Sequence, residues 1–249
     1  MEAHVREIER KLKAAAKGIP RAKAEERRYF MKGVMPFHGL TVPQQRTILK
    51  RGYSFSDQPV ASQLPIWRFV WFNAVSHEGK MQAGLYLGLI DGLPDRESYW
   101  DAIRPWADAI NCWDQSDTLS SEYAALHEAA PDLVYPTLEA WNRDPDPWKR
   151  RQSIVSLFYY AQLRKTRQPA LGKVLPLVTA LLHDDDYYVQ KGVGWTLREC
   201  FNVYPKRALD FLHKHAGDIQ PAAFSAAIEK LTPAQKAEVK RRRKAHRGR

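Results

Sequence analysis

The feature that most constrains the fold of this chain is an internal repeat in a helical background. Two segments, "DPDPWKRRQSIVSL" and "DDDYYVQKGVGWTL", align at an offset of 40 residues. The alignment matches acidic, aromatic, basic and apolar positions, pairing Asp144 with Asp184, Asp146 with Asp186, Trp148 with Tyr188, Arg151 with Lys191 and Leu157 with Leu197. A period near this length in helical sequence is typical of proteins that stack helix pairs one on another.

Helical periodicity extends well beyond the repeat. Apolar residues recur at three- and four-residue spacings, most clearly over residues 7–18, 43–52, 80–93 and 171–185. Proline, glycine or acidic clusters interrupt the pattern at residues 92–95, 143–147 and 183–186. Strand-like alternation and Asn-Gly hairpin signals are missing from the sequence. We therefore predict an all-α fold, a superhelical stack of HEAT-like antiparallel helix pairs with a concave cleft.

The acidic residues of the repeat have an ordinary structural interpretation. Asp184 to Asp186 precede a predicted helix, where carboxylates cap free backbone N–H groups and face the positive end of the helix dipole. We prefer this interpretation to a metal site, because the histidines are scattered and the pair in "HKH" at 213–215 would point to different sides of a helix. We predict no metal and no cofactor.

Length and composition indicate one sizeable globular body. The chain has 249 residues, and no apolar run approaches the roughly 18 residues of a membrane span. The charged N-terminal sequence has no signal-type apolar core, so we expect a soluble cytoplasmic protein, associated with the nucleoid if bacterial. Cys112 and Cys200 lie outside any CxxC pattern, and we expect buried free thiols at both positions.

The charge of the chain is unevenly distributed. The formal net charge is +11, of which the last 14 residues contribute +7, from eight Lys/Arg and one Glu. We predict a single repeat domain over residues 1–232 and a partly disordered basic tail over residues 233–249. A basic tail is either a solvated terminus or a phosphate-binding element. We assign DNA contacts to its central residues, Arg241, Arg242, Arg243 and Lys244.

The segment "NCWDQSD" has two interpretations. Trp113 and Asp117 are four residues apart and share one face if a helix includes both. In the structural interpretation, Asp114 and Ser116 cap a helix whose first turn contains Asp117. In the chemical interpretation, Asp117 is an anion held beside an aromatic wall to face a cation, and the dipole of the helix keeps it ionised.

Two further segments contain residues with a chemical interpretation. In "PWKRRQS", Arg150 and Arg151 diverge by about 100° on a helix and cannot serve the same surface. One of them is expected to face the concave surface, where a planar guanidinium suits a phosphate; the alternative for either residue is a solvated arginine in a salt bridge. In "VQKGVGWTLRE", Gly192 and Gly194 each cost a helix up to about 1 kcal/mol relative to alanine. Two such glycines indicate close approach by another backbone or a ligand. Trp195, which follows them, is either a core residue or part of a site.

Together, "CWDQSD", "PWKRRQSIV" and "VQKGVGWTLRE" resemble the AlkD-type DNA alkylpurine glycosylases, a family with HEAT-like repeats. Upstream, the Gly-apolar-x-x-Pro-x-x-Arg run from Gly39 to Arg46 resembles the N-terminal segment of that family. The resemblance covers roughly residues 25 to 230. Two positions depart from the family pattern: Cys112 stands where an aromatic residue is frequent, and Ser116 where an aliphatic residue is common.

The resemblance implies a role for each matching residue. Asp117 corresponds to the catalytic aspartate, Trp113 and Trp195 to the active-site tryptophans, and Arg151 to an arginine that contacts the DNA backbone. We also expect a DNA contact from Lys191, the repeat counterpart of Arg151. The implied activity is hydrolysis of the glycosidic bond of cationic N3- or N7-alkylated purines in duplex DNA, without base flipping, by a monomeric, monofunctional enzyme.

The main alternative is a non-catalytic HEAT-like scaffold that binds nucleic acid or a protein partner. The basic charge fits this alternative almost as well. Asp117 separates the two, because a groove that only binds phosphate has no use for a central carboxylate, whereas stabilisation of a cationic sugar requires one.

Overall fold

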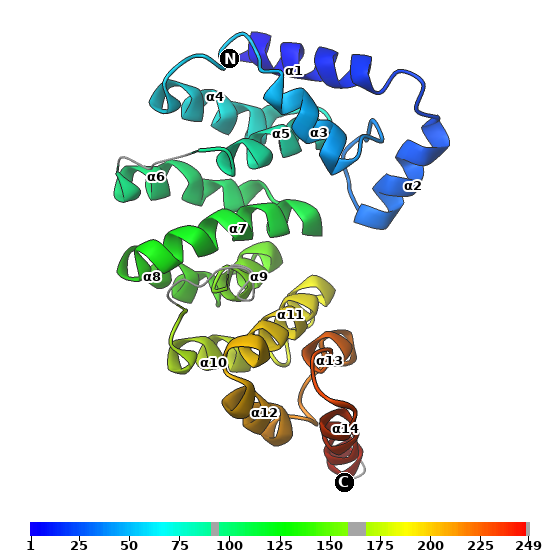
Figure 1. The fold of residues 1–249 in the computed structure, drawn as a ribbon, viewed down its shortest axis with the longest axis vertical. Helices are drawn as coiled ribbons and strands as arrows, with labels where there is room; N and C mark the ends of the chain where they lie inside the picture. The colour runs from blue at the N-terminus through cyan, green and yellow to red at the C-terminus, as the bar shows by residue number, and fades with distance from the viewer. Residues whose placement is uncertain (91–94, 159–167, 248–249) are drawn as a thin grey trace. The chain divides into compact units, whose positions relative to one another are not determined.

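The computed structural model describes residues 1–90, 95–158 and 168–247, and these residues form 14 α-helices and one 3-10 helix, η1 (Figure 1). No strand occurs among them. The predicted all-α fold is therefore confirmed. Of the helix interruption predicted at residues 92–95, residues 92–94 lie outside the described residues.

The chain divides into two compact units, residues 1–122 and 123–249, where the sequence led us to expect one domain over residues 1–232. The border lies inside helix α7, Trp113–Ala129. Unit 1 contains, before α7, the elements α1 (Glu2–Ala15), α2 (Arg21–Met31), α3 (Val42–Lys50), α4 (Val60–Asn73), α5 (His77–Leu87), α6 (Arg96–Ile103) and η1 (Arg104–Ala109).

Helix α5 lies at the centre of unit 1 and packs against α1, α3 and α4, while α6 and η1 pack against α4. The core is unusually aromatic, with Trp67, Trp71, Trp100 and Trp106 all at most 1% exposed. The indole N–H of Trp71 donates to the carbonyl oxygen of Trp106 at 2.8 Å. This bond satisfies a buried donor that would otherwise destabilise the core.

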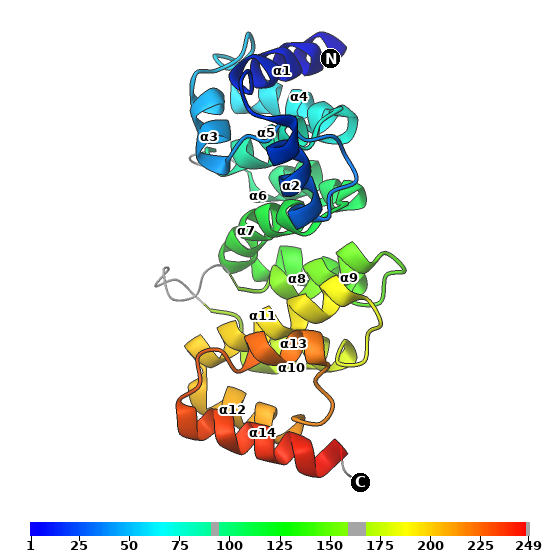
Figure 2. The same ribbon diagram turned by 90° about the vertical axis from the view of Figure 1, so that its right-hand side faces the viewer.

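Unit 2 contains the rest of the chain after residue 122. Its helices after α7 are α8 (Pro131–Trp141), α9 (Pro147–Val155), α10 (Leu171–Ala180), α11 (Tyr187–Val203), α12 (Pro205–Lys214), α13 (Pro221–Ala227) and α14 (Pro233–Arg247). Helix α11 packs against α9, α10, α12 and α13, most extensively against α13 (Figure 2). Unit 2 is thus organised around α11.

The 40-residue repeat appears directly in the local structure of unit 2. The Asp146 carboxylate caps α9 by accepting from the backbone N–H of Trp148 at 2.9 Å. The Asp186 carboxylate caps α11 in the same way, accepting from Tyr188 at 2.8 Å and Val189 at 2.9 Å. The rings of Trp148 and Tyr188 also stack on each other, with centroids 5.2 Å apart. The repeat therefore places equivalent residues side by side, and the predicted capping role is confirmed.

Two further pairs of residues follow the same 40-residue offset. Asp144 and Asp184 each accept the backbone N–H of the residue two positions later at 2.9 Å. Pro136 and Pro176 each lie inside a helix, α8 and α10 respectively. Each repeat therefore consists of a first helix that contains a proline, an acidic turn, and a second helix with an aspartate cap.

The basic C-terminal segment forms helix α14, where the sequence led us to expect partial disorder. Val239 is fully buried, and the Arg243 guanidinium donates to the carbonyl oxygen of Ala216 at 2.9 Å. One apolar and one polar contact therefore hold α14 against the rest of unit 2, and the composition of the segment did not indicate either. No helix in the described part of the chain is long and apolar enough to cross a membrane.

Candidate functional site

Trp113 and Asp117 lie on the first turns of α7. Trp113 is the first residue of the helix, and Asp117 follows one turn later on the same side. Both side chains are half-buried. The acidic residue of the first turn is Asp114, so Asp117 lies just beyond the turn in which we expected it. Trp113 and Asp117 therefore share one face of α7 within unit 1, and their joint role in a site stays a prediction.

An aromatic surface adjoins Trp113. The ring of Phe30, from α2, makes an edge contact with the Trp113 indole, with centroids 5.9 Å apart. Phe30 is 67% exposed and its neighbour Tyr29 is 73% exposed. Phe30 and Tyr29 therefore give α2 an exposed aromatic surface, which adjoins Trp113 through Phe30. The sequence analysis did not select these residues, although consecutive aromatics in the otherwise charged helix α2 were a visible signal.

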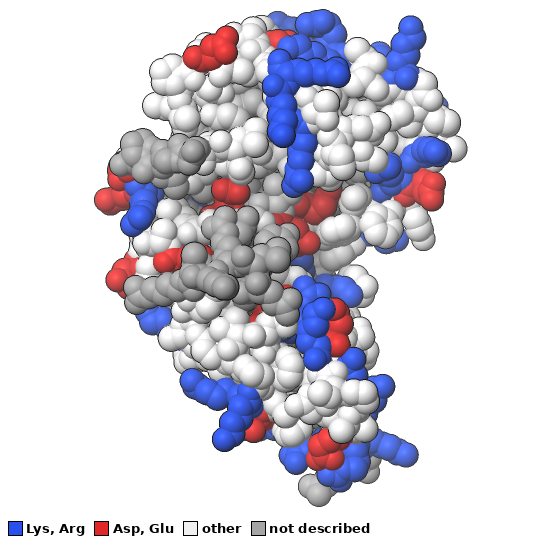
Figure 3. Space-filling view, in the orientation of Figure 1, with Lys and Arg blue, Asp and Glu red and all other residues white. Residues whose placement is uncertain are grey.

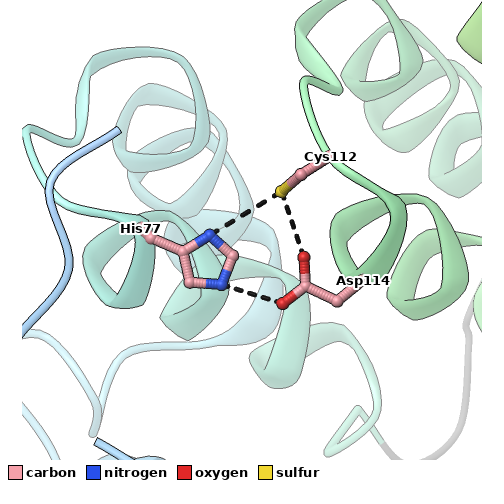
Figure 4. Close-up of side chains that lie close together, drawn as sticks. All are labelled: His77, Cys112 and Asp114. Carbon is pink, nitrogen blue, oxygen red and sulfur yellow. Dashed lines mark hydrogen bonds and ion pairs between the residues drawn. The ribbon is translucent and has the colours of Figure 1, made fainter. Parts of the chain in front are cut away.

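A buried polar cluster holds the start of α7 against α5. His77, the first residue of α5, approaches Asp114 with its Nε2 2.9 Å from Oδ2, and the Cys112 thiol donates to Oδ1 of Asp114 at 3.0 Å (Figure 4). Burial alone would raise the pKa of the Asp114 carboxyl, but its bonds to His77 and Cys112 lower it. Asp114 therefore pairs with a histidine 37 positions earlier, a role that the capping interpretation did not include.

Lys80 fixes the segment that precedes α7. Its ammonium donates to the carbonyl oxygen of Ala109 and lies 4.9 Å from the centroid of the Trp71 ring. Burial lowers the pKa of Lys80 to about 8. Together with the His77–Asp114 pair, this contact fixes both sides of the turn that leads to Trp113.

In unit 2, the two adjacent arginines diverge as predicted. Arg150 pairs with the Asp184 carboxylate at 2.6 Å, and this pairing raises the pKa of its guanidinium. Arg151 turns toward α11, is only 5% exposed, and donates from Nη1 to the carbonyl oxygen of Tyr188 at 2.8 Å. Arg150 is thus the ion-pairing residue, and Arg151 connects α9 to α11.

Both glycines of α11 are sites of close approach, by a backbone at Gly194, as predicted, and by side chains at Gly192. A Cβ atom on Gly192 would lie 3.3 Å from Cγ and Nη1 of Arg151. A Cβ atom on Gly194 would lie 2.3 Å from the carbonyl oxygen of Ala223, in α13. Gly192 therefore admits the Arg151 side chain, and Gly194 admits a neighbouring backbone.

The remaining predicted residues of unit 2 differ in accessibility. Trp195 and Lys191 are half-buried on α11, and the Arg198 guanidinium lies 5.8 Å from the centroid of the Trp195 ring. The grouping of Trp195, Lys191 and Arg151 with the Trp113–Asp117 pair around one DNA duplex stays a prediction.

On α14, the four predicted DNA contacts divide into three kinds. Arg241 and Arg242 share the Glu238 carboxylate, at 2.8 and 2.6 Å. Arg243 lies over the Phe224 ring, 4.1 Å from its centroid, and packs this helix in place. Lys244 is exposed. Basic side chains are visible on both units, with acidic ones among them near α14 (Figure 3). The basic charge of the tail is therefore partly compensated.

The fold and the site define an all-helical protein with stacked, repeated helix pairs and a carboxylate beside an aromatic side chain at a helix start. The sequence matches the DNA alkylation repair enzymes over residues 8–231, and the chain belongs to that family. DNA is therefore its partner, and its role is in the repair of alkylated DNA. No curated protein matches the sequence.

The fold is also similar to a solved structure described as a predicted DNA alkylation repair enzyme from Enterococcus faecalis. The TM-score is 0.66 with 15% sequence identity, and the match covers 85% of this chain and 96% of that one. At this identity the likeness concerns the fold alone, and it extends over nearly all of the solved chain.

Proposed function

We propose that the chain is a monofunctional DNA glycosylase that hydrolyses the N-glycosidic bond of cationic N3- or N7-alkylated purines in duplex DNA. The observation that carries the proposal is the placement of Asp117 one turn after Trp113 on α7, half-buried, in a member of this family. A half-buried carboxylate is shielded from bulk water yet still open to a ligand. It is therefore suited to stabilise a positive charge.

The proposed reaction makes one main demand on the protein. An alkylated purine already carries a positive charge, so its bond to the sugar is weakened, and the sugar becomes oxocarbenium-like as the base leaves. Asp117 faces this developing cation and orients the water that traps it. Opposite charges about 4 Å apart at an effective dielectric constant near 20 attract by about 4 kcal/mol. If the whole of that attraction arises in the transition state, it accelerates the reaction about a thousandfold.

The other residues contribute less. Trp113 and Trp195 hold the deoxyribose and the cationic base against aromatic faces, which contributes about 0.5–2 kcal/mol each. Arg151, which is buried where it joins α9 to α11, acts by positioning. Lys191 and the basic residues of α14 add contacts with DNA phosphates. The large effect therefore belongs to Asp117.

In this proposal, selectivity comes from the charge and lability of the damaged base itself. Enzymes that flip a base out of the duplex bind it in a shaped pocket and read its edges. Here a cationic base that leaves readily needs only a carboxylate and aromatic faces, so the base stays stacked. Water is the nucleophile, and the reaction uses no lysine adduct, catalytic metal or organic cofactor.

Replacing Asp117 by Asn tests the proposal against the scaffold alternative. We expect Asp117→Asn to reduce release of 7-methylguanine and 3-methyladenine from methylated duplex DNA by about a thousandfold, with nearly unchanged DNA affinity. Asp132→Asn is the matched control, because Asp132 is an exposed acidic residue in the first turn of α8. Equal excision by wild type and Asp117→Asn, or no excision by folded wild-type protein, would contradict the proposed function.

A further inference from the structure

The cluster of His77, Cys112 and Asp114 contains three different metal-binding groups in one buried place. His77 is 3% exposed, Cys112 is 1% exposed, and the Asp114 side chain is 13% exposed. One donor atom from each residue lies within 4.8 Å of the other two. Within the described part of the chain, this is the one group of three or more His, Cys, Asp or Glu residues with such spacing.

The distances between the donor atoms are close to those required by a metal ion. A tetrahedral zinc ion with bonds of about 2.0–2.3 Å holds its ligand atoms about 3.3–3.8 Å apart. The Cys112 sulfur lies 3.0 Å from Oδ1 of Asp114 and 3.8 Å from Nδ1 of His77 (Figure 4). The His77 ring turns Nδ1 toward the sulfur and Nε2 toward the Asp114 carboxylate, 2.9 Å away. One nitrogen, the sulfur and one carboxylate oxygen lie within 4.8 Å of one another, so binding one ion requires these side chains to close in around it.

The surroundings orient the imidazole in advance. Phe37 stacks on the His77 ring with centroids 4.1 Å apart and planes 6° apart, and the Gln115 amide lies 3.5 Å from Nδ1 of His77. The stacked Phe37 ring fixes the plane of the imidazole, and the Gln115 amide lies on the side of the ring that faces Cys112. The donor atoms are therefore held near one another before any ion binds.

From this geometry we propose that His77, Cys112 and Asp114 form a site for one zinc ion that joins α5 to the start of α7. A sulfur, a nitrogen and an oxygen donor together suit zinc better than magnesium or calcium, which prefer oxygen alone. Binding replaces the Cys112 S–H bond by a sulfur–zinc bond, and the thiol proton leaves to solvent. The ion then lies directly beside Trp113 and one turn before Asp117.

Charge balance favours this assignment. A thiolate, a carboxylate and a neutral imidazole around a divalent cation give a site with no net charge, which reduces the cost of burying charge. Lys80 is the charged group that interacts with Cys112 from α5. A neutral site adds no net repulsion to its ammonium. Without the ion, the same three side chains satisfy one another through the hydrogen bonds and the ion pair described above.

The site is distinct from the proposed reaction, which uses no catalytic metal, so the two are tested separately. The full chain is expressed with added zinc, desalted, and its metal content measured by mass spectrometry. We expect about one zinc per chain in the wild type and in Cys200→Ala, a control at the second buried free cysteine. We expect Cys112→Ala to lose the zinc while keeping its helical circular dichroism.

Cobalt provides a second measurement that does not depend on activity. After chelation, titration of the apoprotein with Co²⁺ produces a thiolate-to-cobalt absorption band only where a cysteine binds the ion. We expect this band in the wild type and in Cys200→Ala, and we expect it to be missing from Cys112→Ala. A folded wild type that takes up no stoichiometric zinc and gives no band overturns the proposal. Equal zinc in wild type and Cys112→Ala identifies an adventitious ion only, and also overturns it.

Discussion

The starts of α7 and α11 are fixed by different means. Helix α11 begins with a local cap, because the Asp186 carboxylate accepts the backbone N–H groups of the second and third residues that follow it. Helix α7 begins with a long-range clamp, because Asp114, inside its first turn, pairs with His77 of α5. Helix α11, which belongs to the 40-residue repeat, is thus fixed by a residue directly before it in the sequence. The helix that carries the proposed catalytic carboxylate depends on tertiary contacts.

This difference has an energetic consequence. A capping residue contributes about 1 kcal/mol, and its loss leaves N–H groups that water can reach. A buried pair of a carboxylate with its partner contributes little net stability, but removal of the partner leaves the carboxylate buried and uncompensated and costs about 3–5 kcal/mol. Substitutions near α7 are therefore expected to disturb the molecule more than equivalent substitutions near α11.

The largest effect is expected from His77→Leu. The substitution puts an apolar side chain of similar size in place of the imidazole and leaves the Asp114 carboxylate buried without its partner. We therefore expect a loss of about 3–5 kcal/mol in the free energy of unfolding. Chemical denaturation in the presence of a chelator measures the loss without any contribution from bound metal. The same variant would also lower excision activity, because the His77–Asp114 pair holds the first turns of α7, where Trp113 and Asp117 lie.

His127→Leu is the matched control, since His127 is a buried histidine on the same helix. Burial lowers the pKa of His127 to about 4, so the ring is neutral near pH 7. Its replacement therefore leaves no buried charge without a partner. We expect a loss of no more than about 1 kcal/mol. Comparable losses for the two histidines would show that the clamp at α7 is no stronger than ordinary burial.

The second largest effect is expected where α11 packs closely against α13, at Gly194. A Cβ atom on Gly194 would lie 2.3 Å from the carbonyl oxygen of Ala223 and 2.9 Å from its Cα atom. Because these are backbone atoms, Gly194→Ala must displace α13, and we expect a loss of about 2 kcal/mol even after the gain in helix propensity. Thermal unfolding of the full chain measures the change.

Gly172→Ala provides the opposite control. Gly172 lies in α10, and a Cβ atom there would meet nothing within 4 Å. The substitution is expected to stabilise the protein by up to about 1 kcal/mol, because glycine costs more backbone entropy than alanine. If Gly194→Ala stabilised the protein as Gly172→Ala is expected to, the requirement for close approach at Gly194 would be excluded.

Most of the fold could be predicted because its determinants are local. Apolar spacing predicted the helices, and the 40-residue repeat predicted the caps at Asp146 and Asp186, which the structure confirms. The glycines of α11 predicted close approach, since their cost in a helix needs a compensating contact. In each case the signal and its structural consequence lie within one element or one repeat.

The candidate site was less predictable because its supports are distant in sequence. Nothing in "NCWDQSD" indicates that Asp114 pairs with His77, since the two residues meet only when α5 packs near the start of α7. The burial of Arg151 likewise depends on α11, and the packing of Arg243 depends on residues 216–224. Residue types could be predicted from motifs, whereas partners and burial required the tertiary structure.

The smallest effect separates a local cap from its surroundings. Asp186→Ala removes the acceptor for two N–H groups of α11, and we expect a loss of about 1 kcal/mol. Asp146→Ala, at the equivalent position of the repeat, removes the cap of α9 and should cost a similar or slightly smaller amount, because one N–H group is capped there. Asp185→Ala, at the exposed neighbouring position, is the control and should change stability by less than about 0.5 kcal/mol. If the loss for Asp186→Ala approached that for His77→Leu, the start of α11 would also depend on long-range contacts, and the contrast between a local cap and a tertiary clamp would fail.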